Sequence, residues 1–331
     1  MFTTIVDGFL ELSVVGSFSR QGWAVRRRLF DWHPPTAGAL DGRTVLVTGP
    51  TSGLGREMAG AFAALGARVV LVGRDPGKLR SVVTDLEQRH GRDRVTSVVA
   101  DLASLTSVHE AVARIVADES RLDVVVDNAG AMFPSRRESP EGIESTFATM
   151  VVGPFALVAG LLPLLRRTGS ARVIAVTSGG MYAQRLDLDD VGWQRRAWNG
   201  ARAYAQAKRA QVALIREWSR RVPASEITFN AMHPGWANTP GLSASLPGFS
   251  RVMGPLLRTP AEGVDTALWL AAEPALAGHT GRLYLDRRPR PFDRAPQTRL
   301  TRSDRLELWD HVVRLARIAD PTPTNPVGAN Q

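Results

Sequence analysis

Tyr204 and Lys208 are four residues apart, so on a helix a phenol and an ammonium lie on one face, one turn apart. The chain has three tyrosines and 41 basic residues, of which only Lys78 and Lys208 are lysines, so composition explains the pair poorly. A phenol with an ordinary pKa of about 10 is a weak acid-base at neutral pH, and a nearby ammonium lowers that pKa by favouring the phenolate. The pair therefore predicts a proton-transfer centre, with an inert surface pair as the alternative.

A glycine-rich turn lies far upstream of this pair, between a predicted strand (residues 44–48) and a predicted helix (residues 54–65). Its glycines allow a tight turn and let backbone N–H groups approach a pyrophosphate, which then faces the positive end of the helix. A P-loop would place a lysine after the last glycine, and none follows here. The turn therefore predicts dinucleotide binding through Gly49, Thr51, Ser52, Gly53, Leu54 and Gly55.

The next predicted strand, residues 68–72, bears on which dinucleotide is bound. An acidic residue at its end would bind the ribose 2′-hydroxyl of NAD, but here Gly73 and Arg74 follow the strand. An arginine pairs well with a 2′-phosphate. We therefore expect NADP(H), with NAD(H) as the alternative because Asp75 could meet a ribose hydroxyl.

The elements that must position these residues alternate along the chain. Strands are predicted at residues 44–48, 68–72, 95–100, 122–127, 172–177, 227–232 and 282–285, and helices at residues 54–65, 78–89, 104–117, 140–165, 201–221 and 260–271. This alternation predicts a single α/β domain, residues 41–288, with a Rossmann-type, doubly wound parallel sheet of about seven strands flanked by helices.

Extensions are predicted at both ends of this domain. Residues 1–40 form an amphipathic N-terminal extension, in which an apolar stripe (Ile5, Val6, Phe9, Leu10 and Leu12) precedes three consecutive arginines. This segment either packs its aromatic face on the domain or makes peripheral contact with a membrane through residues 1–32. Residues 289–331 predict a C-terminal helix at 303–318 and a polar tail.

Residues 145–165 carry no charge and are long enough to span a bilayer. They stand between two predicted core strands, and a membrane span there would divide the sheet. We therefore expect a helix that is buried against the sheet and against a partner subunit, in a homo-oligomer that is a dimer or a tetramer.

Composition excludes several classes of function. The chain has no cysteine, which rules out disulfides and thiolate chemistry, and its six histidines are too far apart to suggest a metal site. The net charge of +9 comes from scattered arginines mixed with acids, without a nucleic-acid-binding module, so no nucleic-acid partner is expected. No secretory signal is recognisable, and we expect a cytoplasmic protein.

Taken together, these motifs resemble the classical branch of the short-chain dehydrogenase/reductase family over residues 40–286. The motifs that carry the resemblance are the turn from Gly49 to Gly55, Asp101-Leu102, Asp127-Asn128-Ala129-Gly130, Ser178, Tyr204 with Lys208, and Pro234-Gly235 with Thr239. The segments Thr177-Ser178-Gly179-Gly180-Met181, Tyr204-Ala205-Gln206 and Met232-His233-Pro234-Gly235-Trp236-Ala237 are most similar to member twelve of the family and its retinol-dehydrogenase-like neighbours.

The resemblance implies a role for each motif. Tyr204 would donate a proton to the carbonyl oxygen as hydride arrives from the nicotinamide, Ser178 would hydrogen-bond that oxygen, and Lys208 would hold the ribose and tune Tyr204. It also implies the cofactor-binding set Gly49, Thr51, Ser52, Gly53, Leu54, Gly55, Arg74, Asp101, Leu102, Asn128, Ala129, Gly130, Tyr204, Lys208, Pro234, Gly235 and Thr239.

The chain departs from the family pattern at three places. Met150 stands where the family usually has an asparagine that anchors a water in the proton relay, and a thioether is only a weak acceptor. This predicts a different water arrangement, reduced activity or none. Asp127 replaces the first Asn of Asn-Asn-Ala-Gly, and we expect this change to have a mild effect on function. A long loop with Trp193 and Trp198 separates Ser178 from Tyr204 and is expected beside the substrate mouth.

The segment 236–257, where the family places its substrate lid, is apolar and contains Trp236, Leu242, Leu246, Phe249, Met253 and Leu256. It predicts a lipophilic ketone, aldehyde or alcohol as substrate, unless these residues pack on the protein instead. The function expected is therefore an NADP-dependent carbonyl reductase or alcohol dehydrogenase. Because of Met150, the alternative is a dinucleotide-binding redox sensor or scaffold with little turnover.

Overall fold

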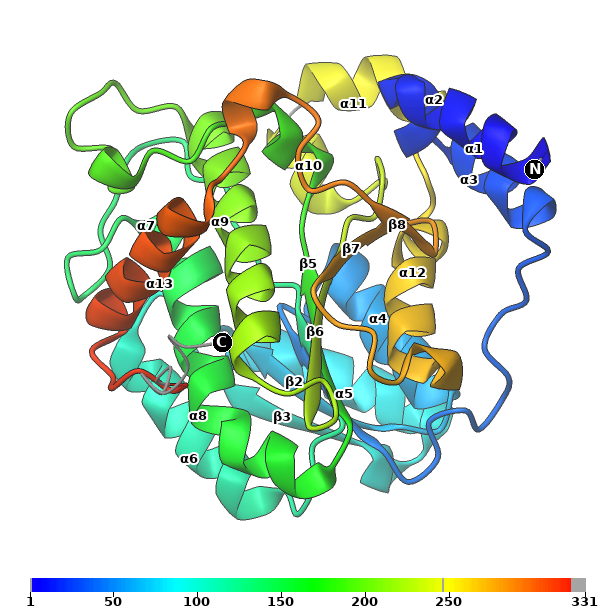
Figure 1. Cartoon of the computed structure of the whole chain (residues 1–331). Helices are drawn as coiled ribbons and strands as arrows, with labels where there is room; N and C mark the ends of the chain where they lie inside the picture. Colours follow the sequence, from blue (N-terminus) through cyan, green and yellow to red (C-terminus); the bar gives the residue numbers. More distant parts are fainter. Residues whose placement is uncertain (1, 246, 323–331) are drawn as a thin grey trace, which may run out of the picture.

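Eight segments, most of them rich in β-branched residues, form one sheet with the strand order β3-β2-β1-β4-β5-β6-β7-β8. The computed structural model describes residues 2–245 and 247–322 (Figure 1). The strands are β1 (Thr44–Thr48), β2 (Arg68–Gly73), β3 (Val95–Val99), β4 (Val124–Asp127), β5 (Ala171–Val176), β6 (Ile227–Met232), β7 (Arg282–Leu285) and β8 (Arg288–Arg290). Strands β1 to β7 are parallel, which confirms the predicted doubly wound sheet, and its order reverses between β1 and β4.

The eighth strand was not predicted. It returns antiparallel to β7 through a two-residue turn in which Asp286 and Arg287 both have positive φ, 54° and 53°. Such a turn suits the twist of a hairpin and usually contains Asn-Gly or Asp-Gly, so Asp-Arg gave no turn signal. The predicted domain boundary at residue 288 therefore falls inside a hairpin. Buried ion pairs from Arg26 and Arg258 to the Asp286 carboxylate hold this turn in place.

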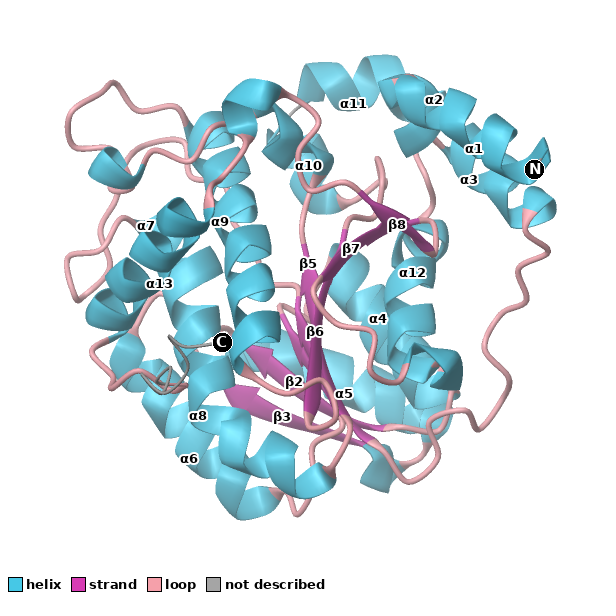
Figure 2. Cartoon of the chain, in the orientation of Figure 1, coloured by secondary structure: helices cyan, strands magenta, loops and turns pink. Residues whose placement is uncertain are grey.

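Helices cover both faces of the sheet, as Figure 2 shows. One face packs against α4 (Gly53–Ala64), α5 (Pro76–His90) and α12 (Pro260–Ala272), and the other against α6 (Leu105–Asp118), α8 (Gly153–Thr168) and α9 (Gly200–Arg221). The central parallel strands, such as β1, β4, β5 and β6, are buried on both faces, so they are apolar along most of their length rather than alternating.

The long apolar helix begins later than the predicted residue 140. Residues before Ser145 form a turn closed by a bridge between Glu138 and Glu144, and the Glu144 carboxylate caps the helix by accepting from the N–H groups of Thr146 and Phe147. Short α7 (Ser145–Phe147) continues through one π-helical turn, Ala148–Val152, into α8.

The stretch Ser145–Thr168 is the one helix in the described part of the chain that is long and apolar enough to cross a membrane, yet 78% of its most apolar window is buried inside the protein. Helix α13 (Arg302–Ala316), which corresponds to the predicted C-terminal helix, packs against α8 and the π-helical turn. Trp309 of α13 is fully buried and packs edge-on against Phe155 of α8 and Trp218 of α9. The chain's own terminus therefore covers part of the helix surface that was expected to meet a partner subunit. The predicted tail beyond residue 322 lies outside the described residues.

The N-terminal extension forms α1 (Phe2–Leu12), α2 (Val14–Phe18) and α3 (Arg20–Leu29) beside β8 and α12 (Figure 1). Its polar face turns inward: Arg26 is fully buried and forms ion pairs with Asp7 and Glu11. Most of the predicted apolar stripe consequently faces outward. The extension does place aromatic side chains on the domain: Phe18 is buried, and the rings of Phe30 and Trp32 lie beside the guanidinium groups of Arg288 and Arg287.

Candidate active site

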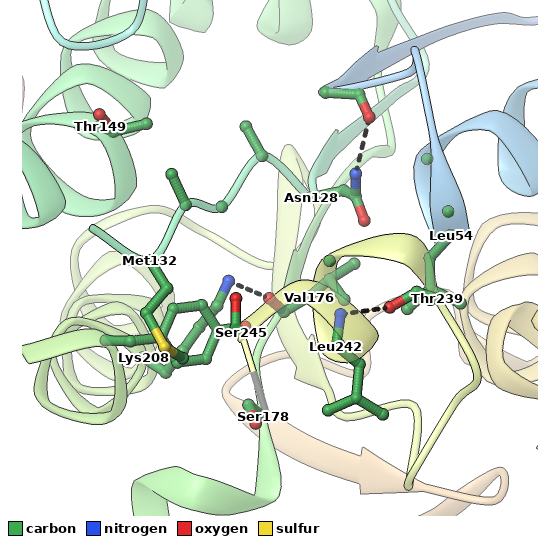
Figure 3. Close-up of a pocket in the computed structure, with 18 of the residues that line it drawn as sticks. Leu54, Asn128, Met132, Thr149, Val176, Ser178, Lys208, Thr239, Leu242 and Ser245 are labelled. Atoms are coloured by element: carbon green, nitrogen blue, oxygen red, sulfur yellow. Dashed lines mark hydrogen bonds between the residues drawn. The ribbon is translucent and has the colours of Figure 1, made fainter. Parts of the chain in front are cut away.

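The carboxyl ends of the parallel strands open into a cleft of about 840 Å³ beside the point where the strand order reverses. Every residue predicted as catalytic or cofactor-binding lines this cleft, although the residues come from many separate segments of the chain. Figure 3 shows Ser178 and Lys208 facing the same space as Asn128, Leu54 and Thr239.

The glycine turn has the geometry that a dinucleotide requires. Gly49 and Gly53 have φ of 66° and 53°, in the left-handed region that favours glycine. A Cβ on Gly55 would lie 2.1 Å from the carbonyl oxygen of Gly49, so only glycine lets the helix start so close to the strand. The N-terminus of α4 thus points its free N–H groups into the cleft, where a pyrophosphate would fit.

Asn128 connects the end of β4 to this turn. Its side-chain nitrogen donates to the carbonyl oxygens of Thr48 and Gly49, at 2.9 and 3.3 Å. The Thr48 hydroxyl in turn accepts from the backbone N–H groups of Asn128 and Ala129. These bonds explain why a short polar motif follows β4: it fixes two neighbouring strand ends to each other.

At the end of β2, Arg74 is exposed and lines the cleft, and so does Lys78 one turn into α5. Asp75 is the N-cap of α5, because its carboxylate accepts from the N–H groups of Gly77 and Lys78. These backbone bonds lower the pKa of Asp75. Lys78 was not predicted as a site residue, although a rare lysine just after this strand was an available signal.

The proton-transfer pair lies on α9, whose first turn is capped by Asn199. Lys208 is 2% exposed, and its Nζ donates to the carbonyl oxygen of Val176 at 2.7 Å (Figure 3). The Nζ also lies 5.7 Å from the centre of the Tyr204 ring. Burial lowers the pKa of Lys208 to about 8, although the negative charge of Asp127 acts to raise it.

The expected lowering of the Tyr204 pKa is wrong for the protein alone. Burial raises the pKa of Tyr204 to about 12, because the phenolate loses water and the ammonium lies over the ring rather than at the hydroxyl. Tyr204 is therefore protonated at neutral pH, which suits a proton donor.

Ser178 follows β5 and caps a short 3₁₀ turn, Gly179–Ala183. Its hydroxyl oxygen accepts from the N–H of Gly180 at 3.3 Å, which leaves the hydroxyl hydrogen available for a ligand. The loop that follows reaches the cleft only through Ala183 and Gln184. The predicted loop thus borders the cleft, while its Trp193 and Trp198 do not line it and pack edge-on against each other.

The predicted lid consists of α10 (Pro240–Ser245) and α11 (Pro247–Met253). Trp236, Leu242 and Phe249 line the cleft, whereas Met253 and Leu256 do not, and Leu246 lies outside the described residues. Met132 and Thr149 also line the cleft without having been predicted. Met150 points elsewhere: it is fully buried behind the site, beside Asp127.

Phe18 was missed because it is 160 positions from Ser178 and carries no motif. Its ring packs edge-on against His233 and Trp236, and a Cβ on Gly179 would lie 2.4 Å from it. Its carbonyl oxygen accepts from the N–H of Trp236 at 2.8 Å. The N-terminal extension thus supports both loops that border the candidate catalytic serine.

Comparison with known proteins agrees with this geometry. The family model described as short chain dehydrogenase matches residues 43–247. Dehydrogenase/reductase SDR family member 12 from Bos taurus is 39% identical over 253 residues, covering 76% of this chain and 79% of that protein. Human retinol dehydrogenase 13 is 31% identical over 323 residues, covering 95% and 96%. A Shigella flexneri structure complexed with NADP has a TM-score of 0.61 and 26% identity, covering 76% of this chain and all of that one.

Proposed function

The chain belongs to the short-chain dehydrogenase/reductase family of oxidoreductases, and we propose that it is an NADP(H)-dependent member that acts on lipophilic ketones, aldehydes or alcohols. The observation that carries the proposal is the meeting of Ser178, Tyr204 and Lys208 with the glycine turn in one cleft. Bound nicotinamide would supply or accept the hydride, and the protein would bind the reactants and donate the proton.

The roles of the three side chains follow from their surroundings. Tyr204, whose raised pKa keeps its proton, donates that proton to the carbonyl oxygen of the substrate. The Ser178 hydroxyl donates a hydrogen bond to the same oxygen as negative charge develops on it. The Lys208 ammonium stabilises the phenolate that Tyr204 leaves behind and holds the ribose hydroxyls.

Selection of NADP(H) is assigned to the end of β2. Arg74 and Lys78 place two positive charges in the part of the cleft where an adenosine 2′-phosphate would lie. Asp75 also lines the cleft, but one of its carboxylate oxygens, Oδ1, is engaged as a helix cap. Selection of a lipophilic substrate is assigned to Met132, Trp236, Leu242 and Phe249, which give the other end of the cleft an apolar wall.

Titration of the purified protein with NADPH and NADH, followed by nicotinamide fluorescence and then a panel of lipophilic ketones and aldehydes, tests the proposal. We expect NADPH to bind more tightly than NADH and to be oxidised. Tyr204→Phe should abolish oxidation and leave NADPH binding within about twofold, since it removes the proton donor and keeps the aromatic ring at this position of the cofactor site. Tight binding without turnover across the panel would favour the sensor or scaffold, and failure of the folded protein to bind either nucleotide would refute the proposal.

We propose in addition that α1 and α2 make peripheral contact with an anionic membrane. The supporting observation is the outward face of these helices, where Phe9 and Leu12 are 69% and 84% exposed. A lipophilic substrate would then be taken from the bilayer at the edge of the molecule where the lid lies.

A further inference from the structure

Lys208 is a buried ammonium with little compensation close by. In the described part of the chain its Nζ has one hydrogen-bond partner, the carbonyl oxygen of Val176, and no carboxylate oxygen lies within 4 Å of it. Removing an ammonium from water costs several kcal/mol unless an opposite charge compensates for it. The charge on Lys208 therefore requires a source of stabilisation beyond its immediate contacts.

Asp127, at the end of β4, is the carboxylate placed to provide it. The residue is 7% exposed, and its Oδ2 accepts from Nε2 of Gln211 at 2.8 Å. Gln211 is one turn beyond Lys208 on α9, so the same helix carries the ammonium and the amide that fixes the carboxylate. Asp127 Oδ1 has no partner among the described residues, which leaves that oxygen's charge free to act on its surroundings.

The electrostatic coupling acts in both directions. Burial raises the pKa of Asp127 to about 6, and the charge of Lys208 is the first influence that opposes this rise. Burial lowers the pKa of Lys208, and Asp127 opposes that fall. Each ion therefore helps to keep the other ionised.

The other groups packed around Asp127 are uncharged. Gln211 on α9 donates the hydrogen bond to Oδ2, and Thr48 on β1 is an uncharged neighbour. Behind the carboxylate is a small cavity of about 30 Å³, lined by Met150 from the π-helical turn, by Phe155 and Val158 of α8, and by Trp218 of α9. No second titratable side chain lines this cavity in the described part of the chain. Lys208 is thus the charged group to which Asp127 responds.

We propose that Asp127 is a positioning residue for the reaction proposed above: its carboxylate is the buried counter-charge that keeps Lys208 protonated while Tyr204 gives up its proton. The pairing of the two charges is a property of the protein alone. Only the effect on proton transfer from Tyr204 rests on the proposed function. When the Tyr204 O–H bond breaks and the substrate O–H bond forms, the phenolate left behind faces an ammonium that Asp127 has kept charged.

The chain's two lysines allow the proposal to be tested directly by NMR. With lysine labelled at Cε by ¹³C, two side-chain signals can be titrated without cofactor or substrate, and the exposed Lys78 serves as an internal reference. The test variant is Asp127→Asn, which keeps the size of the side chain and an acceptor for Gln211. We expect the Lys208 titration to move to lower pH by roughly one unit or more, because the burial penalty is no longer opposed, while Lys78 is unchanged.

Met150→Leu is the matched control, since it changes the same cavity without changing charge, and it should leave the Lys208 titration in place. If Asp127→Asn does not fold, Asp127→Ser removes the same charge with a smaller side chain. A Lys208 titration that stays within about 0.3 unit of the wild type in a folded variant would overturn the pairing.

The pH dependence of turnover is the second measurement. The alkaline limb of kcat should move to lower pH in Asp127→Asn in parallel with the Lys208 titration. A shifted titration with an unchanged limb would overturn the positioning role. If the wild type turned over no substrate, the proposed function would fail, while the NMR titration would still decide whether Asp127 is the counter-charge.

Discussion

At the scale of single residues, the site shows one physical cause acting on two groups in opposite directions. Burial removes water from Tyr204 and from Lys208 alike, so it raises the pKa of the phenol and lowers the pKa of the ammonium. The two pKa values, ordinarily close to each other, are thereby moved apart, to about 12 for Tyr204 and about 8 for Lys208. The result is a phenol that holds its proton and an ammonium that remains charged only below about pH 8.

The cofactor preference proposed here is also a residue-scale property. Replacing Arg74 by alanine should weaken NADPH binding roughly 10- to 100-fold, the effect of losing one charged hydrogen bond of about 1.5–3 kcal/mol, and should leave NADH nearly unchanged. Fluorescence titration of both nucleotides measures this difference.

Arg80→Ala is the control, because Arg80 is exposed on α5 and does not line the cleft. Equal weakening of NADPH and NADH in Arg74→Ala would show that Arg74 does not read the 2′-phosphate. Equal weakening of NADPH in both variants would point to overall charge instead.

At the scale of elements, the N-terminal helices act as a brace for the site. The buried ion pairs of Arg26 and Arg258 with Asp286 join α3, the segment before α12 and the β7–β8 turn. Phe18, at the end of α2, packs on the Trp236 segment, and Trp236 in turn meets Phe249 of the lid. A path of contacts therefore leads from the extension to the substrate end of the cleft.

Phe18→Ala tests this brace. Removing a buried phenylalanine should lower the free energy of unfolding by about 3–5 kcal/mol, or, if the extension detaches by itself, should expose residues 1–30 to protease. Denaturant unfolding and limited proteolysis distinguish these two results. Leu12→Ala, at a highly exposed position of the preceding helix, should change neither. A Phe18→Ala protein that matched the wild type in both assays would contradict the brace.

At the scale of the whole molecule, the N-terminal helices α1 to α3 turn their acidic side chains inward and leave apolar and basic side chains on the outside. The two acids of residues 3–30, Asp7 and Glu11, turn inward to buried arginine, whereas Arg27 and Arg28 are exposed. The outward face thus combines apolar side chains with positive charge, which is the combination that favours an anionic lipid surface. At this edge Phe18 of α2 and Phe249 of the lid helix α11 both pack on Trp236.

Vesicle cosedimentation tests the membrane contact. We expect binding to vesicles of mixed neutral and anionic lipid, with the bound fraction falling as salt rises. The pair Phe9→Ser and Leu12→Ser should weaken binding at least tenfold, since each buried side chain contributes about 1.5–3 kcal/mol. The pair Val99→Ser and Val116→Ser removes exposed valines elsewhere and should have little effect. If the Phe9→Ser and Leu12→Ser pair instead converted an oligomer in solution into a smaller species, the outward face of α1 would be a contact between copies of this chain.

The sequence determined those features of the protein that depend on local spacing and local conformation. The seven parallel strands and the helices between them were predictable because their apolar patterns repeat over a few residues. The glycine turn was predictable because positive φ and close backbone approach require glycine. The Tyr204–Lys208 pair was predictable because a helix brings residues four apart onto one face.

Only the tertiary structure decided the features that depend on distant segments and on burial. It placed Asp127 where its charge acts on Lys208, and Phe18 against Trp236, because the sheet brings together chain segments that are far apart in sequence. It turned the charged face of α1 inward, since partners from α3 and β8 were there to compensate those charges. It raised the pKa of Tyr204 where spacing alone predicted a fall, because the loss of water outweighs an ammonium that lies over the ring.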